Sequence, residues 1–379
     1  MRNAHKRWGL GAALILVAGG LLASAAPTAA HAAAAAPPNA CKHQPRMGHI
    51  AGIVAPVGPC AAHITSDPAK GTPPLLYHGG PVMMTPTTSP LVITPIFWAP
   101  TGHTMASAYK SLIGTYLADV AAASGQNTNV FSVANEYSGT NGQIHYSVSI
   151  GTTINDTNAL PASGCTVARN DKRGIYADGT GYNACLDDAQ LQSQVNSVTA
   201  AHGLPHNLSH IYVLFLPKAV ESCFNAGSTT TSSNECTINH QPSAAFCAYH
   251  SEDPASAVYA NMPFPVYESS TGFTCGSDGN FGTVESPNGN PDADVEVSPT
   301  SHEVNEAITD PDTSTGWYDA SGFENGDECA YVYGGTQGTA GALYNQVING
   351  GHFLTQEEFS NKDFALTGGG CVQSANAEA

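Results

Sequence analysis

Positive charge is scarce in this chain, whose 379 residues include 12 Lys and Arg against 30 Asp and Glu. So acidic a chain is a poor partner for nucleic acid or for an anionic membrane, because both attract basic surfaces. The acidity suits a protein that binds cations, and it also suits one that only needs to stay soluble. Charged residues make up just 11% of the total, which is too few for a disordered, highly charged tail.

Long apolar runs are absent after residue 32. The one such run, residues 8–26, follows three basic residues and precedes Ala30-His31-Ala32. This order predicts a secretory signal peptide over residues 1–32, cleaved after Ala32, in preference to an uncleaved membrane anchor. Without it, 9 Lys and Arg remain against 30 Asp and Glu, a net charge of −21. We therefore expect a secreted, extracellular protein with no membrane segment in its mature form.

No two cysteines form a Cys-x-x-Cys pair, which weakens the case for a cysteine-ligated zinc site. An even number of cysteines in an exported chain predicts up to five disulfides, whose pairing the sequence does not fix. Cys247 and His250 would suit a nucleophilic pair only if Cys247 were a free thiol, so bridging argues against that role. Tyr249 or His250 could still line a cleft beside a bound metal ion. The ten cysteines are at positions 41, 60, 165, 185, 223, 236, 247, 275, 329 and 371.

The chain divides by composition into three parts. Residues 33–75 are rich in Ala, Pro and Gly without lasting periodicity, and we interpret them as a linker or a propeptide-like arm. Residues 76–379 are predicted to form a single α+β domain of zincin-like type with a mixed sheet. Its last part, about 312–379, is expected to be a smaller irregular lobe. Glycine-rich phosphate loops and internal repeats are both absent.

Hydrophobic periodicity predicts the main elements. Pro95 indicates that its strand lies at a sheet edge or contains a bulge. A helix near residue 300 is expected to start with Ser298 as N-cap and Pro299 as first residue, and to end before Pro311. The other predicted elements are helices over 106–124 and 187–201, strands over 91–98, 211–216 and about 257–266, and a β-hairpin over 130–150.

The helix before Pro311 carries the most informative run of the chain, Ser301-His302-Glu303-Val304-Asn305-Glu306. His302 and Glu306 are four apart and project from one helix face, and Asp310 is one further step of four along it. The pattern is close to His-Glu-x-x-His, in which two ligands hold zinc and the intervening Glu acts on a bound water. We therefore predict His302 and Glu306 as metal ligands and Glu303 as general base.

A catalytic zinc site needs a third protein ligand. Glu324 follows Glu306 by eighteen residues, a spacing at which the chain could turn back over the helix. Asp310 is the other candidate, although it would also be placed to orient His302. The predicted function is a zinc metallopeptidase, a hydrolase that uses a metal-bound water, acts on an extracellular protein or peptide and works as a monomer.

Other interpretations of the motif remain open. Two carboxylate ligands would neutralise most of the charge on zinc and let calcium or manganese compete better. The stripe could also be an exposed acidic helix face on which His302 merely pairs with Glu306. Asp292, Asp294 and Glu296 alternate just before it, which is typical of solvent exposure and less often of calcium.

Two blocks of the chain resemble the phosphate-induced protein 1 family, which includes the plant EXORDIUM proteins. The first is Tyr77-His78-Gly79-Gly80-Pro81-Val82, followed by a strand that ends in Ile-Phe-Trp. The second runs from Ser301 to Pro311 and continues through Gly316-Trp317-Tyr318 and Glu324-x-Gly326-Asp327-x-Cys329. The blocks touch both ends of the globular region, and the middle matches only loosely.

The resemblance implies an exported, wall- or matrix-associated protein, linked in plants to growth responses and without an established reaction. Plant members lack the helix histidine, so His302 makes this chain more similar to microbial members with a His-Glu-x-x-Glu core. The alternative that follows is a non-catalytic extracellular protein of the EXORDIUM type, with a structural ion at the same acidic cluster.

Overall fold

The structure is a computed structural model that describes residues 73–231, 235–237, 246–267 and 275–375. The predicted signal peptide, almost all of the predicted arm, Cys41 and Cys60 lie outside the described residues. The described residues belong to one compact unit. None of their helices combines the length and the apolar character that crossing a membrane requires.

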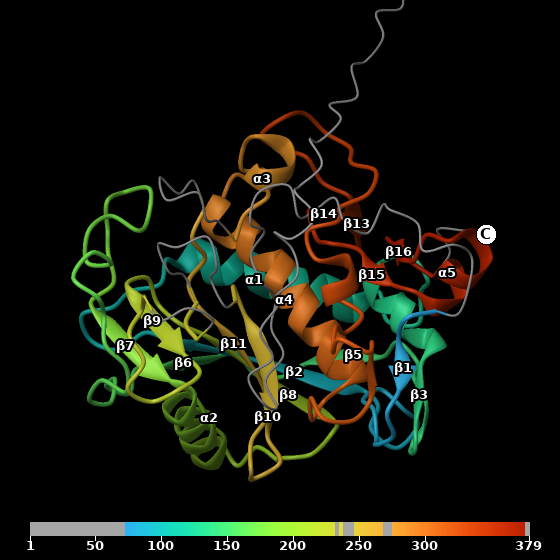
Figure 1. The fold of residues 1–379 in the computed structure, drawn as a ribbon, viewed down its shortest axis with the longest axis horizontal. Coiled ribbons are helices and arrows are strands. Elements are labelled where there is room, and N and C mark those ends of the chain that lie inside the picture. The colour runs from blue at the N-terminus through green and yellow to red at the C-terminus, as the bar shows by residue number, and fades with distance from the viewer. Residues whose placement is uncertain (1–72, 232–234, 238–245, 268–274, 376–379) are drawn as a thin grey trace, which may run out of the picture. The chain divides into compact units, whose positions relative to one another are not determined.

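A six-stranded mixed sheet lies at the centre of the fold (Figure 1), so the predicted α+β class with a mixed sheet is confirmed. Its order is β10-β11-β8-β2-β5, and β6 also pairs with β2. All pairs are parallel except that of β10 with β11. The strands are β2 (Leu91–Trp98), β5 (Val148–Ile150), β6 (Ile154–Asp156), β8 (His210–Phe215), β10 (Tyr249–Glu252) and β11 (Val258–Met262).

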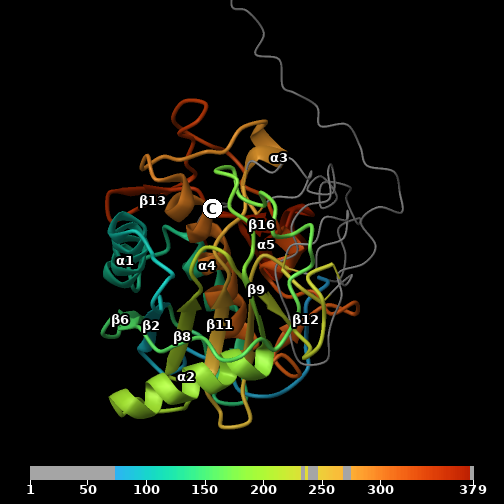
Figure 2. The ribbon, with the colours of Figure 1, turned by 90° about the vertical axis from the view of Figure 1, so that its left-hand side faces the viewer.

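The two central strands are apolar without alternation because both of their faces are buried. Ile93, Phe97 and Phe215 belong to the hydrophobic cluster on one face, which also includes residues of α1 and α4. Trp98 and Leu214 belong to the cluster on the other face, which includes residues of α2. Figure 2 shows α2 on one side of the sheet and α1 and α4 on the other.

The alternative that Pro95 marks an edge strand is wrong, since β2 lies in the middle of the sheet. The bulge alternative agrees with the registers, because the step from Ile93 to Ile96 faces the longer step from Ile150 to Ile154. On one side, β2 pairs first with β5 and then with β6, and Pro95 falls between these two registers. Ile93 accepts a backbone hydrogen bond from Gly151, and Ala99 donates one to Asp156. Along a strand, the backbone N–H and C=O groups of every second residue point to the same side. The nitrogen of Pro95 therefore points to the side of β5 and β6, as the backbone groups of Ile93 and Ala99 do. No carbonyl on that side needs a hydrogen-bond donor at this position, so the missing N–H of proline is tolerated.

The two predicted helices before residue 203 are confirmed as α1 (Ser107–Ala122) and α2 (Asp188–His202). Asp187 and Gln190 form a capping box at the start of α2, which stabilises such a helix by roughly 1 kcal/mol. Gly203 ends α2 with φ +62°, a left-handed conformation that glycine adopts without strain.

The predicted hairpin over 130–150 is confirmed at its turn, residues 139–142, but its strands are far shorter than expected. Asn129 accepts a hydrogen bond from Phe131 N and caps a 3₁₀ helix, η2 (Val130–Glu136). Only a short ladder follows, β3 (Ser138–Gly139) against β4 (Gly142–Gln143), and Val148–Ile150 then joins the main sheet as β5.

The helix that carries the motif is longer than expected, because α4 spans Pro291–Thr309. The predicted start at Ser298 is therefore wrong. The same signal occurs eight residues earlier, where Asn290 is the N-cap and Pro291 the first helical residue. Pro299 lies inside the helix and leaves the carbonyl of Val295 without its usual donor. The predicted end before Pro311 is confirmed.

The segment after α4 consists of short elements that pack on the rest of the unit. β1 (Leu76–Tyr77) pairs with β12 (Trp317–Tyr318), and Tyr137, the C-cap of η2, donates a 2.6 Å hydrogen bond to the carbonyl of Phe359. The elements after α4 that have not yet been named are η3 (Asp327–Cys329), β13 (Gln346–Ile348), β14 (Gly351–Phe353), β15 (Glu358–Phe359), α5 (Asn361–Thr367) and β16 (Cys371–Val372). Three further elements precede α4, namely β7 (Ala184–Asp187), β9 (Val220–Cys223) and α3 (Asp278–Phe281).

The eight described cysteines form four disulfides, which confirms the disulfide prediction for this part of the chain. The bridges are Cys165–Cys185, Cys223–Cys236, Cys247–Cys275 and Cys329–Cys371. Cys247 is therefore no nucleophile. Such bridges are typical of chains that fold in an oxidising compartment.

Candidate metal centre

Three segments that are distant in sequence meet at the second half of α4. The helix supplies His302, Glu303 and Glu306, the edge strand β10 supplies His250, and the chain around η3 returns with Asp327. The first four of these side chains have no exposed surface, and that of Asp327 is 5% exposed. The alternative of an exposed acidic helix face is therefore wrong.

His302, Glu306 and Asp327 form a first group of metal-ligand type. His302 Nε2 lies 2.9 Å from Glu306 Oε1 and 3.7 Å from Asp327 Oδ1. The backbone N–H of Asp327 also donates to Glu306 Oε1 at 2.9 Å, so the returning chain is fixed directly to the helix. One potential ligand atom from each residue lies within 4.8 Å of the other two.

His250, Glu303 and Glu306 form a second group that meets the same distance criterion. His250 Nδ1 lies 3.2 Å from Glu303 Oε2 and 3.6 Å from Glu306 Oε2. On the other side of the ring, Nε2 lies 3.0 Å from the carbonyl oxygen of Asp310. Glu306 is thus common to both groups.

The two candidates for a third ligand lie close by but belong to neither group. Glu324 Oε1 is 3.8 Å from His250 Nε2, and both Glu324 and Asp310 are fully buried. Asp310 is the C-cap of α4, and its backbone carbonyl meets His250. The structure therefore brings Glu324 beside His250, and it places Asp327 beside His302.

Sequence reasoning did not propose Asp327 or His250 as ligands. Asp327 follows Glu324 by three residues in the same Glu-x-Gly-Asp block, which is therefore the signal in the sequence that points to this residue. His250 carries no local signal, because only the pairing of β10 with β11 places it beneath α4.

Gly326 allows the returning chain to come this close. A Cβ atom at this position would lie 2.7 Å from His302 Nδ1 and 3.0 Å from Glu306 Oε1. The first distance is shorter than an ordinary Cβ contact, and the second is at the lower limit of such contacts. A residue with a side chain would therefore push the loop away from the helix.

Gln356 contacts both His302 and the returning chain. Its Nε2 lies 2.8 Å from the carbonyl of Gly326 and 2.5 Å from His302 Nδ1. In the neutral ring, an amide nitrogen that donates to Nδ1 leaves the proton on Nε2, which then faces Glu306 Oε1, whereas the charged ring carries protons on both nitrogens and needs the amide oxygen at Nδ1. Ligation of a metal through Nε2 requires loss of this proton and a turn of the amide, so that its oxygen accepts from Nδ1.

The centre is strongly acidic, and among the described residues no Lys or Arg forms an ion pair with it. Burial raises the pKa of each of Glu303, Glu324, Asp327 and Glu358. Burial alone would lower the pKa of a histidine. The neighbouring carboxylates outweigh it here, so the pKa values of His250 and His302 rise to about 10. Without further positive charge, the cluster must retain protons.

The donor set fits a divalent cation. Glu306 Oε2 and Asp327 Oδ1 are buried and have no hydrogen-bond partner among the described residues. Imidazole nitrogen together with carboxylate oxygen is a ligand combination that zinc accepts and that manganese also tolerates. A cation would balance carboxylates that otherwise ionise only at a high desolvation cost.

Access to the centre from solvent is limited. A small pocket along α4, with a volume of about 10 Å³, is lined by Asp294, Val295 and Ser298 and not by the motif residues. A larger one of about 350 Å³ is lined by Glu136 and Lys362 among others.

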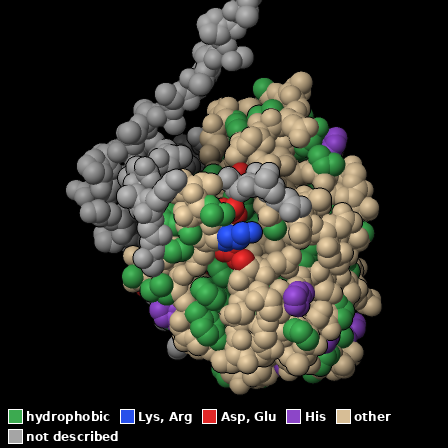
Figure 3. All heavy atoms as spheres, turned by 90° about the vertical axis from the view of Figure 1, so that its right-hand side faces the viewer, with side chains coloured by type: hydrophobic (Ala, Val, Ile, Leu, Met, Phe, Trp, Pro, Cys, Tyr) green, Lys and Arg blue, Asp and Glu red, His purple; other side chains and the backbone are tan. Residues whose placement is uncertain are grey.

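Figure 3 shows one face of the molecule, where acidic and basic side chains gather at a single spot in a mostly uncharged surface.

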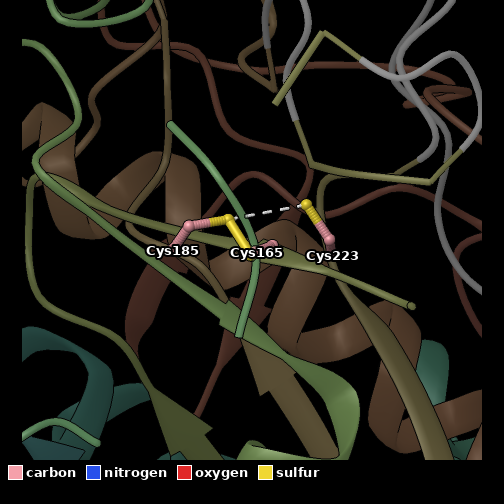
Figure 4. A group of neighbouring side chains, drawn as sticks. All are labelled: Cys165, Cys185 and Cys223. Atoms are coloured by element: carbon pink, nitrogen blue, oxygen red, sulfur yellow. Dashed lines mark hydrogen bonds between the residues drawn. A yellow bond between two sulfur atoms is a disulfide. The ribbon is translucent and has the colours of Figure 1, made fainter. Parts of the chain in front are cut away.

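A third cluster of ligand type, formed by Cys165, Cys185 and Cys223, has a different explanation. The first two sulfurs are bonded to each other, and Cys223 is bridged to Cys236. Figure 4 shows the bonded sulfurs of Cys165 and Cys185 beside Cys223. Cys185 Sγ and Cys223 Sγ are 3.6 Å apart. Oxidised sulfurs are not thiolate ligands, so this cluster consists of two neighbouring disulfides.

Fold and site together define a disulfide-bonded α+β protein with a buried centre of histidines and carboxylates. A scan against protein-family models finds no match to this chain, and neither a search of curated proteins nor a search of solved structures finds one.

Proposed function

We propose that this chain is a secreted metallopeptidase in which His302, Glu306 and Asp327 bind one divalent metal ion, with zinc as the expected ion. One observation carries the proposal: the side chain of Asp327 meets those of His302 and Glu306, two residues of the helix motif that also contains Glu303, in a buried group. Asp327 takes the place that sequence reasoning gave to Glu324 or Asp310. The motif helix also packs on a mixed sheet beside its edge strand, which supports a zincin-like domain.

The positions of the neighbouring groups support peptide hydrolysis as the reaction. When bound, the ion supplies Lewis acidity that activates water and polarises a substrate carbonyl. Glu303 lies next to His302 in the chain and would take the proton of the attacking water and pass it to the leaving amine. His250, 3.2 Å from Glu303 Oε2, holds that carboxylate in place.

The burial of the centre favours a second candidate function. A peptide reaches Glu303 only if neighbouring segments move apart, because the side chains of His302, Glu303 and Glu306 have no exposed surface. A buried ion could instead fasten η3 to α4, together with the Cys329–Cys371 bridge. The chain would then be a non-catalytic extracellular protein of the EXORDIUM type with a structural ion, which calcium could also provide.

Elemental analysis of the purified chain, combined with a peptidase assay on casein, tests the proposal. We expect bound zinc in the wild type, loss of that zinc in His302→Ala, and loss of casein cleavage in Glu303→Gln with zinc retained. His145→Ala is the matched control, because this histidine is exposed and distant in sequence from the motif.

The outcomes separate the two candidates. Absence of any bound transition metal contradicts the metallopeptidase. Zinc that is bound through His302 in a protein without peptidase activity supports the structural ion, and so does calcium as the only metal.

A further inference from the structure

The second group of ligand type, His250 with Glu303 and Glu306, has no assigned role as a binding site. Its three side chains come from two elements, β10 and α4, and none has exposed surface. It is not merely a cluster of acids, because a ring nitrogen faces both carboxylates. Glu306 Oε2 is also buried and has no hydrogen-bond partner among the described residues.

The orientation of His250 is that of a metal ligand. Its Nε2 lies 3.0 Å from the carbonyl oxygen of Asp310, which can accept a hydrogen bond but cannot donate one. Nε2 therefore carries a proton, and Nδ1, once it has released its own proton to make room for a cation, is the nitrogen that can offer an electron pair on the side of Glu303 and Glu306. Histidines that bind metals commonly donate their other N–H to a backbone carbonyl in this way.

Glu306 presents one oxygen to each histidine. Its Oε1 is 2.9 Å from His302 Nε2, whereas its Oε2 is 3.6 Å from His250 Nδ1. A carboxylate with its two oxygens turned toward different imidazoles can serve two cations. The surrounding acids, which include Glu324, Asp327 and Glu358, can balance the charge of a second divalent ion.

We propose that the chain has a second site for a divalent metal ion, formed by His250, Glu303 and Glu306, with Glu306 shared between the two ions. This inference rests on the proposed function, since it assumes the first ion at His302. The second site is the weaker one. Its ligands must give up the contact between His250 and Glu303, and two cations that share one carboxylate repel each other.

Occupancy of the second site has a functional consequence. Glu303 is the proposed general base, and a cation at its carboxylate removes the basic electron pair. The second ion is therefore inhibitory, and peptidase activity should fall as free zinc rises through the range in which the second ion binds.

The test is zinc binding by equilibrium dialysis on the full mature chain over a wide range of free zinc, followed by metal analysis. We expect one tightly bound zinc and a second that binds at least tenfold more weakly. His250→Asn and Glu303→Gln should each abolish the second step and retain the first. The Asn variant keeps a hydrogen-bond donor near Asp310, and a thermal melt of each variant verifies that it is folded.

Each outcome is decisive. Two zinc ions, with the weaker one lost in both variants, support the second site. One zinc at all concentrations, lost in His302→Ala and unaffected by His250→Asn, overturns the second site and leaves the proposed function intact. One zinc lost in both histidine variants shows a single ion held by both rings, which also overturns the inference. No bound zinc overturns the proposed function itself.

Discussion

The two halves of α4 bury acidic side chains in contrasting surroundings. In the second half, Glu303 and Glu306 meet two imidazoles and the returning Asp327. In the first half, Glu296 is equally buried, but neither carboxylate oxygen has a hydrogen-bond partner among the described residues. Burial raises the pKa of Glu296 well above its usual range, and the nearby Asp292 raises it further.

This difference shows that burial of an acid is not sufficient for a metal site. Glu296 lies near the phenol groups of Tyr109 and Tyr176, which carry no positive charge. Its carboxyl group therefore keeps its proton and stays neutral. Glu306 lies between histidines, and attraction to His302 overcomes the effect of burial and lowers its pKa. A convergent set of imidazole and carboxylate atoms can accept a cation, whereas a lone buried carboxylic acid cannot.

Replacement of the shared ligand should have the largest effect. We expect Glu306→Ala to weaken zinc binding by more than about a hundredfold, because both groups lose an oxygen ligand at once. Glu296→Gln, on the same helix and equally buried, is the matched control and should keep the wild-type zinc content. Zinc titration monitored by calorimetry measures both. Equal zinc affinities in the two variants would mean that the halves of α4 do not differ as described.

Removal of the metal should destabilise the wild type and not a variant in which the second half of α4 has lost a ligand. A ligand at a hundred times its dissociation constant stabilises the folded state by about 2.7 kcal/mol, so chelation with EDTA should lower the melting temperature of the wild type. The same treatment should leave the melting temperature of His302→Ala almost unchanged. A wild-type melt that is insensitive to EDTA and to added zinc argues against a bound ion.

The close approach of the returning chain offers a more local test. Gly326→Ala would place a Cβ atom 2.7 Å from His302 Nδ1, and such overpacking typically costs 1–3 kcal/mol of stability. The shift of the loop should also weaken zinc binding. Gly335→Ala is the control, because a Cβ atom there meets nothing within 4 Å. Denaturant unfolding with and without zinc separates the two effects, and equal behaviour of the two variants would show that the loop is not held against the helix.

The effect expected at Glu296 does not involve the metal and depends on pH. A glutamate has an ordinary pKa of 4.5, and burial raises this pKa in the folded chain. The folded chain thus keeps a proton that the unfolded chain has released. The stability contributed by Glu296 is therefore complete below pH 4.5 and is lost as the pH rises toward the folded pKa.

Glu296→Gln removes this dependence. The stability of the variant relative to the wild type should increase by about 1.4 kcal/mol per pH unit between the two pKa values. Thermal melts of both proteins at several pH values measure the difference. A difference that stays constant with pH would mean that Glu296 is not held protonated by the fold.

The sequence was sufficient for the elements with strong periodicity and clear end signals. The apolar runs of β2 and β8 and the caps of α2 carry that information locally. Short segments that depend on tertiary context were mispredicted, as at 130–150, where Val148–Ile150 pairs with β2 and not with its neighbour in the chain. The solvent exposure expected for Asp294 and Glu296 was wrong, because α4 is buried around its whole circumference and not only on one face.

The candidate site was predictable in part for the same reason. Helical spacing alone relates His302, Glu303 and Glu306, so the motif could be identified from one segment. Asp327 depends on how a loop returns over the helix, and Gly326 is the residue that permits that return. His250 depends on strand order, since β10 is an edge strand beneath α4 that pairs only with β11 in the sheet. No spacing in the sequence encodes that contact.

Anomalous X-ray scattering at the zinc absorption edge, from crystals grown with zinc, tests the central claim most directly. The account predicts a peak about 2.0–2.2 Å from His302 Nε2 and from carboxylate oxygens of Glu306 and Asp327. The absence of a peak beside His302 Nε2 in crystals of a protein that retains this fold, whether or not a peak lies elsewhere, would contradict it.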